Sequence, residues 1–351
     1  MKRKISAMTV ALALGYCGLA FADDNSASVT QSGTNNAATV LQDPFGGSAA
    51  ATVSQNGGLN SADVHQTGLG FGMSASVSST GNSNSATVLQ DGTNNASASV
   101  SQTGDGNNAT VNQTPSAGLT GFSNEAHGAI TQQGDRNTAT INQTGTNCPG
   151  CTGNGASATI QQINGTQDSI ATVNQTGPSF RSSAAITQDF SFNASTATVN
   201  QTGADQDASI RQHGGFHASA QVDQSGHNET ATINQTLAVN FGTAHITQAG
   251  DSNTATATQN LNSNFNTANI DQSGTLNSAT ITQENLVLGS NTWNDATILQ
   301  SGTSHMATIN QGGQGTSLSH NSALITQTGS GNTAHATQGG GAGNSISITQ
   351  H

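Results

Sequence analysis

Apolar and polar residues alternate in short segments that recur along almost the whole chain. The segment reads N/S-x-A-x-V/I-x-Q, as at residues 36–42, 84–90 and 277–283. Ala, the β-branched residue, Asn and Gln share one face, while Thr, Ser, Asn or Asp occupy the other. This period-two alternation predicts a β-strand. Seven residues with one alanine and one Val or Ile cannot bury a core alone, so we expect each strand to stack on copies of itself.

The closing glutamine of each segment marks one predicted strand. It stands at 31, 42, 55, 66, 90, 102, 113, 132, 143, 162, 175, 188, 201, 212, 224, 235, 248, 259, 272, 283, 300, 311, 327, 338 and 350, and Ser79 fills the same slot in a degenerate copy. Of the 25 intervals between these 26 units, 11 are 11 residues long. The sequence therefore predicts an all-β, cross-β solenoid of about 13 two-strand rungs, with two facing parallel, in-register sheets.

In-register stacking places equivalent side chains about 4.8 Å apart in columns. A buried amide without a partner costs a few kcal/mol, but in a column each amide donates to the next copy. We therefore predict a core ladder that includes Gln31, Gln42, Gln55, Gln66, Gln90, Gln102, Gln113, Gln143, Gln201, Gln235, Gln283, Gln300, Gln350, Asn36, Asn107, Val40, Val111 and Ile281. Glu229 occupies one inward Asn/Ser slot of this ladder.

The connections between strands are irregular in two ways. Longer insertion loops are predicted near 114–125, 144–155, 284–292 and 312–320, and they contain Pro115, Pro149 and Trp293. The 11-residue interval also changes phase: up to Gln143 it joins odd units to even ones, and from Gln201 it joins even units to odd ones. We therefore expect the tight turn to change edges midway along the stack.

The N-terminus predicts export. Lys2, Arg3 and Lys4 precede an apolar run at 8–19 and the small-x-small site at 20–22, so residues 1–22 are interpreted as a signal peptide cleaved after Ala22. The run is too short for a transmembrane helix. Residues 23–351 then keep 3 basic and 18 acidic residues, a net charge of −15. Because phosphate binding rests on clustered Lys and Arg, nucleic acid is not an expected partner.

Candidate chemistry outside the repeat is sparse. Cys148-Pro-Gly-Cys151 is interpreted as a small disulfide that closes an insertion loop, with free thiols as the alternative; neither a second Cys pair at zinc spacing nor a βαβ unit accompanies it. His213 and His217 flank two glycines, and the ten histidines follow no metal-binding signature. We expect no enzymatic activity, no metal and no cofactor.

The repeat resembles that of the curlins, the subunits of bacterial curli, which are functional amyloid fibres. Residues 102–113, Gln-Thr-Gly-Asp-Gly-Asn-Asn-Ala-Thr-Val-Asn-Gln, and residues 31–42 carry the resemblance, which extends over 25–350. It implies a secreted cell-surface fibre (a fimbrium or pilus) with adhesion or biofilm roles, a second curlin-type subunit or nucleator as partner, and an outer-membrane export channel. Familiar curlins are shorter and carry a Gly-rich targeting segment before the first repeat, whereas here the first strand follows the predicted cleavage site almost at once.

We expect the stack to continue between molecules. The repeat begins by Asn25 and runs to Gln350 with no recognisable cap, and uncapped solenoid ends expose unpaired backbone groups. Head-to-tail self-association into a homopolymer is the predicted function. The alternatives are a monomeric β-solenoid adhesin and an ice-binding solenoid that uses outward Thr256-x-Thr258 and Thr280-x-Thr282. The sequence does not separate a major subunit from a nucleator.

Overall fold

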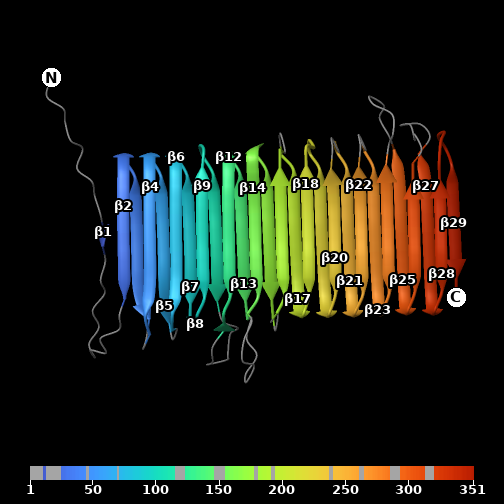
Figure 1. Ribbon diagram of the computed structural model, residues 1–351, viewed down its shortest axis with the longest axis horizontal. Helices are drawn as coiled ribbons and strands as arrows, with labels where there is room; N and C mark the ends of the chain where they lie inside the picture. Colours follow the sequence, from blue (N-terminus) through green and yellow to red (C-terminus); the bar gives the residue numbers. More distant parts are fainter. Residues whose placement is uncertain are drawn as a thin grey trace.

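The computed structural model describes residues 11–12, 25–44, 47–68, 71–114, 123–145, 155–177, 181–190, 194–236, 240–260, 265–284, 293–312 and 320–351. These residues form an all-β solenoid in which two long parallel sheets face each other and extend from one end of the molecule to the other (Figure 1). The predicted fold class is therefore confirmed. Across the described ranges, no helix has the length and apolar character needed to cross a membrane.

Sheet A and sheet B are built from alternate strands of the chain. Sheet A contains, in spatial order, β1 (Ala11–Leu12), β3 (Ala37–Pro44), β5 (Ser61–Gly68), β7 (Ser85–Asp91), β10 (Asn108–Thr114), β13 (Thr138–Thr144), β15 (Ile170–Thr176), β17 (Thr196–Ala204), β19 (Ser219–His227), β21 (Thr243–Asp251), β23 (Thr267–Thr275), β25 (Asn294–Thr303), β27 (Asn321–Ser330) and β29 (Ser345–Gln350).

Sheet B contains β2 (Ser26–Thr34), β4 (Ala49–Gly58), β6 (Met73–Asn82), β9 (Ser97–Thr103), β12 (His127–Asp135), β14 (Ser157–Gln167), β16 (Ser183–Asp189), β18 (Asp207–His213), β20 (Thr230–Thr236), β22 (Thr254–Asn260), β24 (Ser278–Glu284), β26 (Met306–Gln311) and β28 (Thr333–Gln338). A separate pair joins β8 (Thr93–Asn94) to β11 (Ser123–Asn124).

The strands pair in parallel and in the predicted register. In β10 and β13, for example, Ala109 lies beside Ala139 and Gln113 beside Gln143. The two-residue β1 lies in the predicted signal segment and pairs with β3. Apart from β1, each sheet has 13 strands among the described residues, and these are the 26 predicted units. The rungs therefore run from β2–β3 to β28–β29.

The core is a thin layer of small and β-branched side chains between the sheets. Val40, Val111 and Ile281 are each at most 3% exposed and lie in this layer. Full burial of one such residue contributes about 1.5–3 kcal/mol. Because each rung adds only a few of these residues, stability accumulates along the axis rather than around a single centre.

The tight turns that join consecutive strands, which we call arcs, move from one edge of the solenoid to the other midway along it, as the spacing predicts. In the N-terminal half they join sheet B to sheet A and contain the stacked Gly33, Gly57, Gly81, Gly104 and Gly134; in the C-terminal half they join sheet A to sheet B and contain Gly203, Gly226, Gly250, Gly274, Gly302 and Gly329. Gly250 shows why glycine is needed: its φ is 133°, and a Cβ there would lie 1.9 Å from the carbonyl oxygen of Gly274.

Three predictions fall wholly or largely outside the described residues. The signal segment is described only at residues 11–12, and most of the predicted insertion loops are not described. Cys148 and Cys151 also lie outside the described residues, so their disulfide stays a prediction.

Candidate functional site

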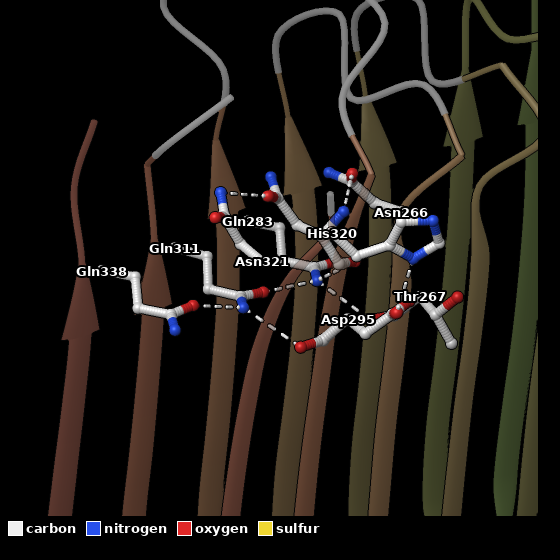
Figure 2. Close-up of polar contacts among 9 residues, drawn as sticks. Asn266, Thr267, Gln283, Asp295, Gln311, His320, Asn321 and Gln338 are labelled. Atoms are coloured by element: carbon white, nitrogen blue, oxygen red, sulfur yellow. Dashed lines mark hydrogen bonds and ion pairs between the residues drawn. The ribbon is translucent and has the colours of Figure 1, made fainter. Parts of the chain in front are cut away.

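Two ladders of glutamine amides run along the solenoid, one in each sheet, and the sheet B ladder is interrupted once. Each Nε2 donates to the Oε1 of the glutamine on the next rung: Gln113 reaches Gln143 at 2.9 Å and Gln143 reaches Gln175 at 2.9 Å. Figure 2 shows the same chain of bonds from Gln283 to Gln311 to Gln338, at 2.8 and 2.7 Å. The donors all point toward the higher-numbered rung, so the ladders have a direction.

The glutamines also join the two sheets. Gln311 donates to the backbone carbonyl of Asp295, and Gln283 donates to that of Thr267, so sheet B is bonded to the first residues of the facing sheet A strands (Figure 2). Gln42 does the reverse from sheet A, donating to the carbonyls of Ser26 and Ala49 in sheet B. Because each amide bonds both along the axis and across the core, glutamine is tolerated where burial is complete.

The asparagine column closes the tight arcs in a similar way. Asn107 donates from Nδ2 to the carbonyl of Gly134 on the next rung at 2.7 Å, and its Oδ1 accepts the backbone N–H of Asn137. Asn36 does the same with Gly57 and Asn60. Each asparagine thus satisfies one arc carbonyl and one strand amide that the parallel ladder leaves open.

The structure brings the predicted ladder glutamines into these two columns. Thirteen predicted members are Gln31, Gln55, Gln102, Gln235 and Gln283 in sheet B, and Gln42, Gln66, Gln90, Gln113, Gln143, Gln201, Gln300 and Gln350 in sheet A. One defect interrupts the sheet B column. Ser79 lies beside Gln55, and Gln55 Nε2 is buried without a partner among the described residues.

The ladder ends carry complementary groups. At the first rung, no described donor reaches Oε1 of Gln31 or Gln42, although their Nε2 atoms donate to Gln55 and Gln66. At the last rung, the bonds that Gln338 and Gln350 donate within the described part of the chain go to backbone carbonyls, those of Ser322 and Thr333. One end therefore presents amide acceptors and the other presents amide donors.

Some core-facing side chains of the end rungs are only partly covered. Val29 in β2 and Ile346 and Ile348 in β29 are partly buried and pack against the core cluster, whereas their counterparts in the middle, such as Val199, are fully buried. The outer edges of β2, β28 and β29 have no paired strand among the described residues. These edges and side chains form what we call the terminal faces of the solenoid.

An aromatic column along the sheet B-to-A edge of the C-terminal half was not predicted. The rings of His217, Phe241, Phe265, Trp293 and His320 stack along the axis, with neighbouring centroids 4.4–5.2 Å apart. The planes of Phe265 and Trp293 differ by only 2°. Each of these residues stands seven positions before the closing glutamine of the following sheet A strand, but the residue type varies, so the repeat pattern did not single them out.

Other side-chain chemistry serves the arcs and the surface. Arg136 forms two bonds with Asp168, at 2.7 and 2.8 Å, and the guanidinium lowers the pKa of that carboxyl. His213 contacts Asp189 and His217 stacks on Phe241, so the two histidines do not converge on one point. Within the described ranges, no group of three or more His, Cys, Asp or Glu could hold a metal ion.

The outward threonines proposed for ice binding lie on neighbouring strands, where Thr256 pairs with Thr280 and Thr258 with Thr282. The array is limited, because Asn234 and Asn310 take the second position on the flanking strands β20 and β26. On sheet A, the outward position instead carries an amide ladder through Asn112, Asn142, Asn174 and Asn200 to Asp223, with bonds of 2.6–2.8 Å.

Comparison with known proteins adds one finding. Three segments of the chain match the family described as the curlin associated repeat, at residues 22–57, 81–114 and 320–351. No curated protein matches the chain. The matched segments include the first strand β2 and the last strand β29, and the register of the structure carries the same repeat through the strands between them.

Proposed function

The chain is a curlin-repeat protein, and from that premise we propose that it is a structural subunit of an extracellular curli-like amyloid fibre. Molecules add end to end, so that β28 of one copy pairs with β2 of the next and β29 pairs with β3. Residues 1–22, of which Ala11–Leu12 pair with the edge of β3, are removed on export. The fibre contributes to adhesion and to a biofilm matrix at the cell surface, and a nucleating subunit and an outer-membrane channel are its expected partners.

The observation that carries this proposal is the polarity of the ladders. Gln338 and Gln350 have an Nε2 hydrogen to spare, and Gln31 and Gln42 have a free Oε1 among the described residues. Continuing the observed register brings Gln338 over Gln31 and Gln350 over Gln42. The bond that repeats within the molecule then forms once more in each sheet between molecules.

Burial supports the same joint. In that register, Ile346 and Ile348 of one copy stack on Ala38 and Val40 of the next, and the two partly exposed isoleucines leave water. Backbone N–H and C=O groups at open strand edges gain partners at the same time, which is the usual driving force for edge-to-edge addition of parallel strands. A heterologous contact of this kind does not close on itself, so it generates a filament.

The proposal is tested by placing a charge on one terminal face. We expect the mature chain to form fibres with a reflection near 4.8 Å, and Ile348→Lys to remain monomeric with unchanged β circular dichroism, because the ammonium group would be buried in the joint. Ser347→Lys is the matched control: Ser347 is exposed on the other side of the same strand, so it should still polymerise. Equal fibre formation by both variants would refute the joint.

The same preparations separate the alternatives. A wild-type chain that stays monomeric and folded at high concentration supports the adhesin interpretation. Thermal hysteresis of dilute monomer, lost in Thr256→Leu and Thr280→Leu, supports ice binding through the outward threonines.

A further inference from the structure

Glu229 lies in a column that otherwise contains hydrogen-bond donors. The column occupies the inward slot just before each sheet B strand of the C-terminal half and consists of Gln206, Glu229, Asn253, Asn277, His305 and Asn332. Gln206 and Glu229 are on neighbouring rungs, since Asp207 pairs with Thr230 and the N–H of Asp207 donates to the carbonyl of Glu229. Both side chains are at most 1% exposed.

The slot requires a side chain that donates a hydrogen bond. Its occupants donate to the carbonyl four residues earlier in the chain, as Gln206 does to Thr202 at 3.2 Å and Asn277 does to Ser273 at 3.0 Å. They also donate to the arc glycine on the next rung, as Gln206 does to Gly226 at 3.3 Å. An ionised carboxylate can only accept, so an ionised Glu229 could not supply the hydrogen that the other occupants of the slot donate to these carbonyls.

His305 shows that a titratable residue can fit the slot if its proton is in the right place. Its Nε2 lies 3.2 Å from the carbonyl of Ser301, and its Nδ1 accepts the backbone N–H of Asn332 at 3.3 Å. The neutral ring with the proton on Nε2 therefore reproduces the donor and acceptor of asparagine. Neutral glutamic acid is the corresponding form for residue 229.

Two buried oxygens on successive rungs also lack a donor. Glu229 Oε1 accepts from Asn253 Nδ2 at 3.3 Å, but Glu229 Oε2 has no described partner, and neither has Gln206 Oε1. One hydrogen on Glu229 Oε2 supplies a donor between these rungs. We propose that Glu229 is protonated in the folded solenoid and makes the stability of this arc column depend on pH around neutrality.

The surrounding charges agree with a neutral Glu229. Burial raises the pKa of Glu229 to about 7, against the opposing hydrogen bonds with Asn253 and with the backbone of Ser225, and the negative charge of Asp251 adds to the rise. The titratable groups of the adjacent arcs are His227 beside it, Asp251 on the next rung, and Asp205 and Asp207 on the preceding one. Asp205 is paired with Arg181 at 2.7 Å, so that guanidinium is already engaged with another carboxylate.

The sign of the pH effect follows from proton linkage. The folded state binds the proton more tightly than the unfolded chain, whose glutamate has a pKa near 4.5. The stabilisation that the folded state gains from the Glu229 proton is fully present below about pH 4.5, declines between that value and about 7, and is lost at higher pH. The ratio of unfolded to folded chain should therefore gain a factor of roughly 300 across this window from Glu229 alone.

The test measures the proton and its effect separately on soluble mature chain. The sequence has three glutamates, Glu125, Glu229 and Glu284, so selective ¹³C labelling of glutamate gives three carboxyl resonances. We expect one of them, absent in Glu229→Gln, to titrate near pH 7. Urea unfolding from pH 4.5 to 8.5 should be steeper in pH for wild type than for Glu229→Gln, and Glu284→Gln should keep the wild-type slope.

The inference does not depend on polymerisation, since both readouts are made on single molecules. Glu229→Gln should fold, because glutamine already occupies the same slot at Gln206. A Glu229 resonance that titrates near 4.5 overturns the proposal. Identical pH slopes for wild type and Glu229→Gln overturn it as well.

Discussion

Gln55 and Ser79 are neighbours in the sheet B column, and the serine is too short to receive the Gln55 amide. Gln55 Nε2 is consequently buried with no partner among the described residues, while Ser79 Oγ donates onward to Gln102 Oε1 at 3.0 Å. The column is thus intact on both sides of a single missing bond. This defect offers a way to measure what one rung of the ladder contributes.

Ser79→Gln should stabilise the monomer. The new amide gives Gln55 an acceptor and replaces the serine hydroxyl as donor to Gln102, and a net gain of about 1 kcal/mol is expected for a buried hydrogen bond of this kind. Denaturant unfolding of the mature chain measures it. Ser78→Gln places the same side chain on the exposed face of the strand and should change the free energy of unfolding by less than about 0.5 kcal/mol. Equal effects would mean that the ladder bond is not the source.

Removing a ladder amide in the middle of the solenoid should have the opposite effect. Gln175 accepts from Gln143 and donates to Gln201, and it is fully buried. Gln175→Ala leaves both neighbours short of a partner, so we expect a loss of about 2–4 kcal/mol from unsatisfied amides and the cavity together. Thr176→Ala, on the exposed position next to it, should be nearly neutral in the same unfolding measurement. A near-neutral Gln175→Ala would contradict the ladder's structural role.

The arc glycines should differ among themselves in a predictable way. Gly250→Ala forces a methyl group to within 1.9 Å of the Gly274 carbonyl oxygen, so it should cost more than about 3 kcal/mol or prevent folding. A Cβ at Gly331 would have no atom within 4 Å, so Gly331→Ala should lower the free energy of unfolding only through the strain of its φ of 70°, by about 1 kcal/mol. Thermal unfolding of the two variants is the measurement, and similar losses would show that stacking of the arcs is not what requires glycine.

The aromatic column should report on the C-terminal half. Trp293 is the sole tryptophan of the chain and stacks on Phe265 at 4.4 Å. Phe265→Ala should lower the free energy of unfolding by about 0.5–1.5 kcal/mol from lost ring contact, beyond the burial term, and should change Trp293 emission. Phe190→Ala is the control, because Phe190 contacts His213 outside the column and should leave the emission unchanged. Unaltered emission in Phe265→Ala would show that the rings are not stacked in solution.

The sequence was sufficient for the parts of this fold that repeat. Strand positions, sheet assignment, register and the Gln ladder all follow from one slot recurring in phase, because identical neighbours stack favourably only in register. Residues that do not recur were harder to interpret. The rings of the aromatic column share one position seven residues before a closing glutamine, but His, Phe and Trp alternate there, and only the stacked strands show that the rings meet.

The protonation of Glu229 also required the structure. The sequence places it in an inward slot, but only the contacts of Gln206 and Asn277 show that this slot donates to carbonyls. The repeat pattern alone also does not show which hydrogen bond is lost at Ser79. The serine leaves the Gln55 amide on the preceding rung without an acceptor, and Gln55 is identified as its neighbour only when the register is known.

The central claim, that the columns continue from one molecule into the next, is tested most directly by a disulfide across the joint. In a background with Cys148 and Cys151 replaced by Ser, Thr337→Cys and Thr30→Cys place thiols on outward positions that stack on each other if β28 pairs in register with β2 of the next copy. At about 4.8 Å between strands, a disulfide is geometrically allowed. We predict that oxidised fibres of this double variant yield a ladder of covalent multimers under denaturing, non-reducing conditions. Thr337→Cys with Thr39→Cys, which faces outward from the other sheet, should yield none. Fibres of the first pair that dissolve to monomer, or equal cross-linking of both pairs, would contradict the account.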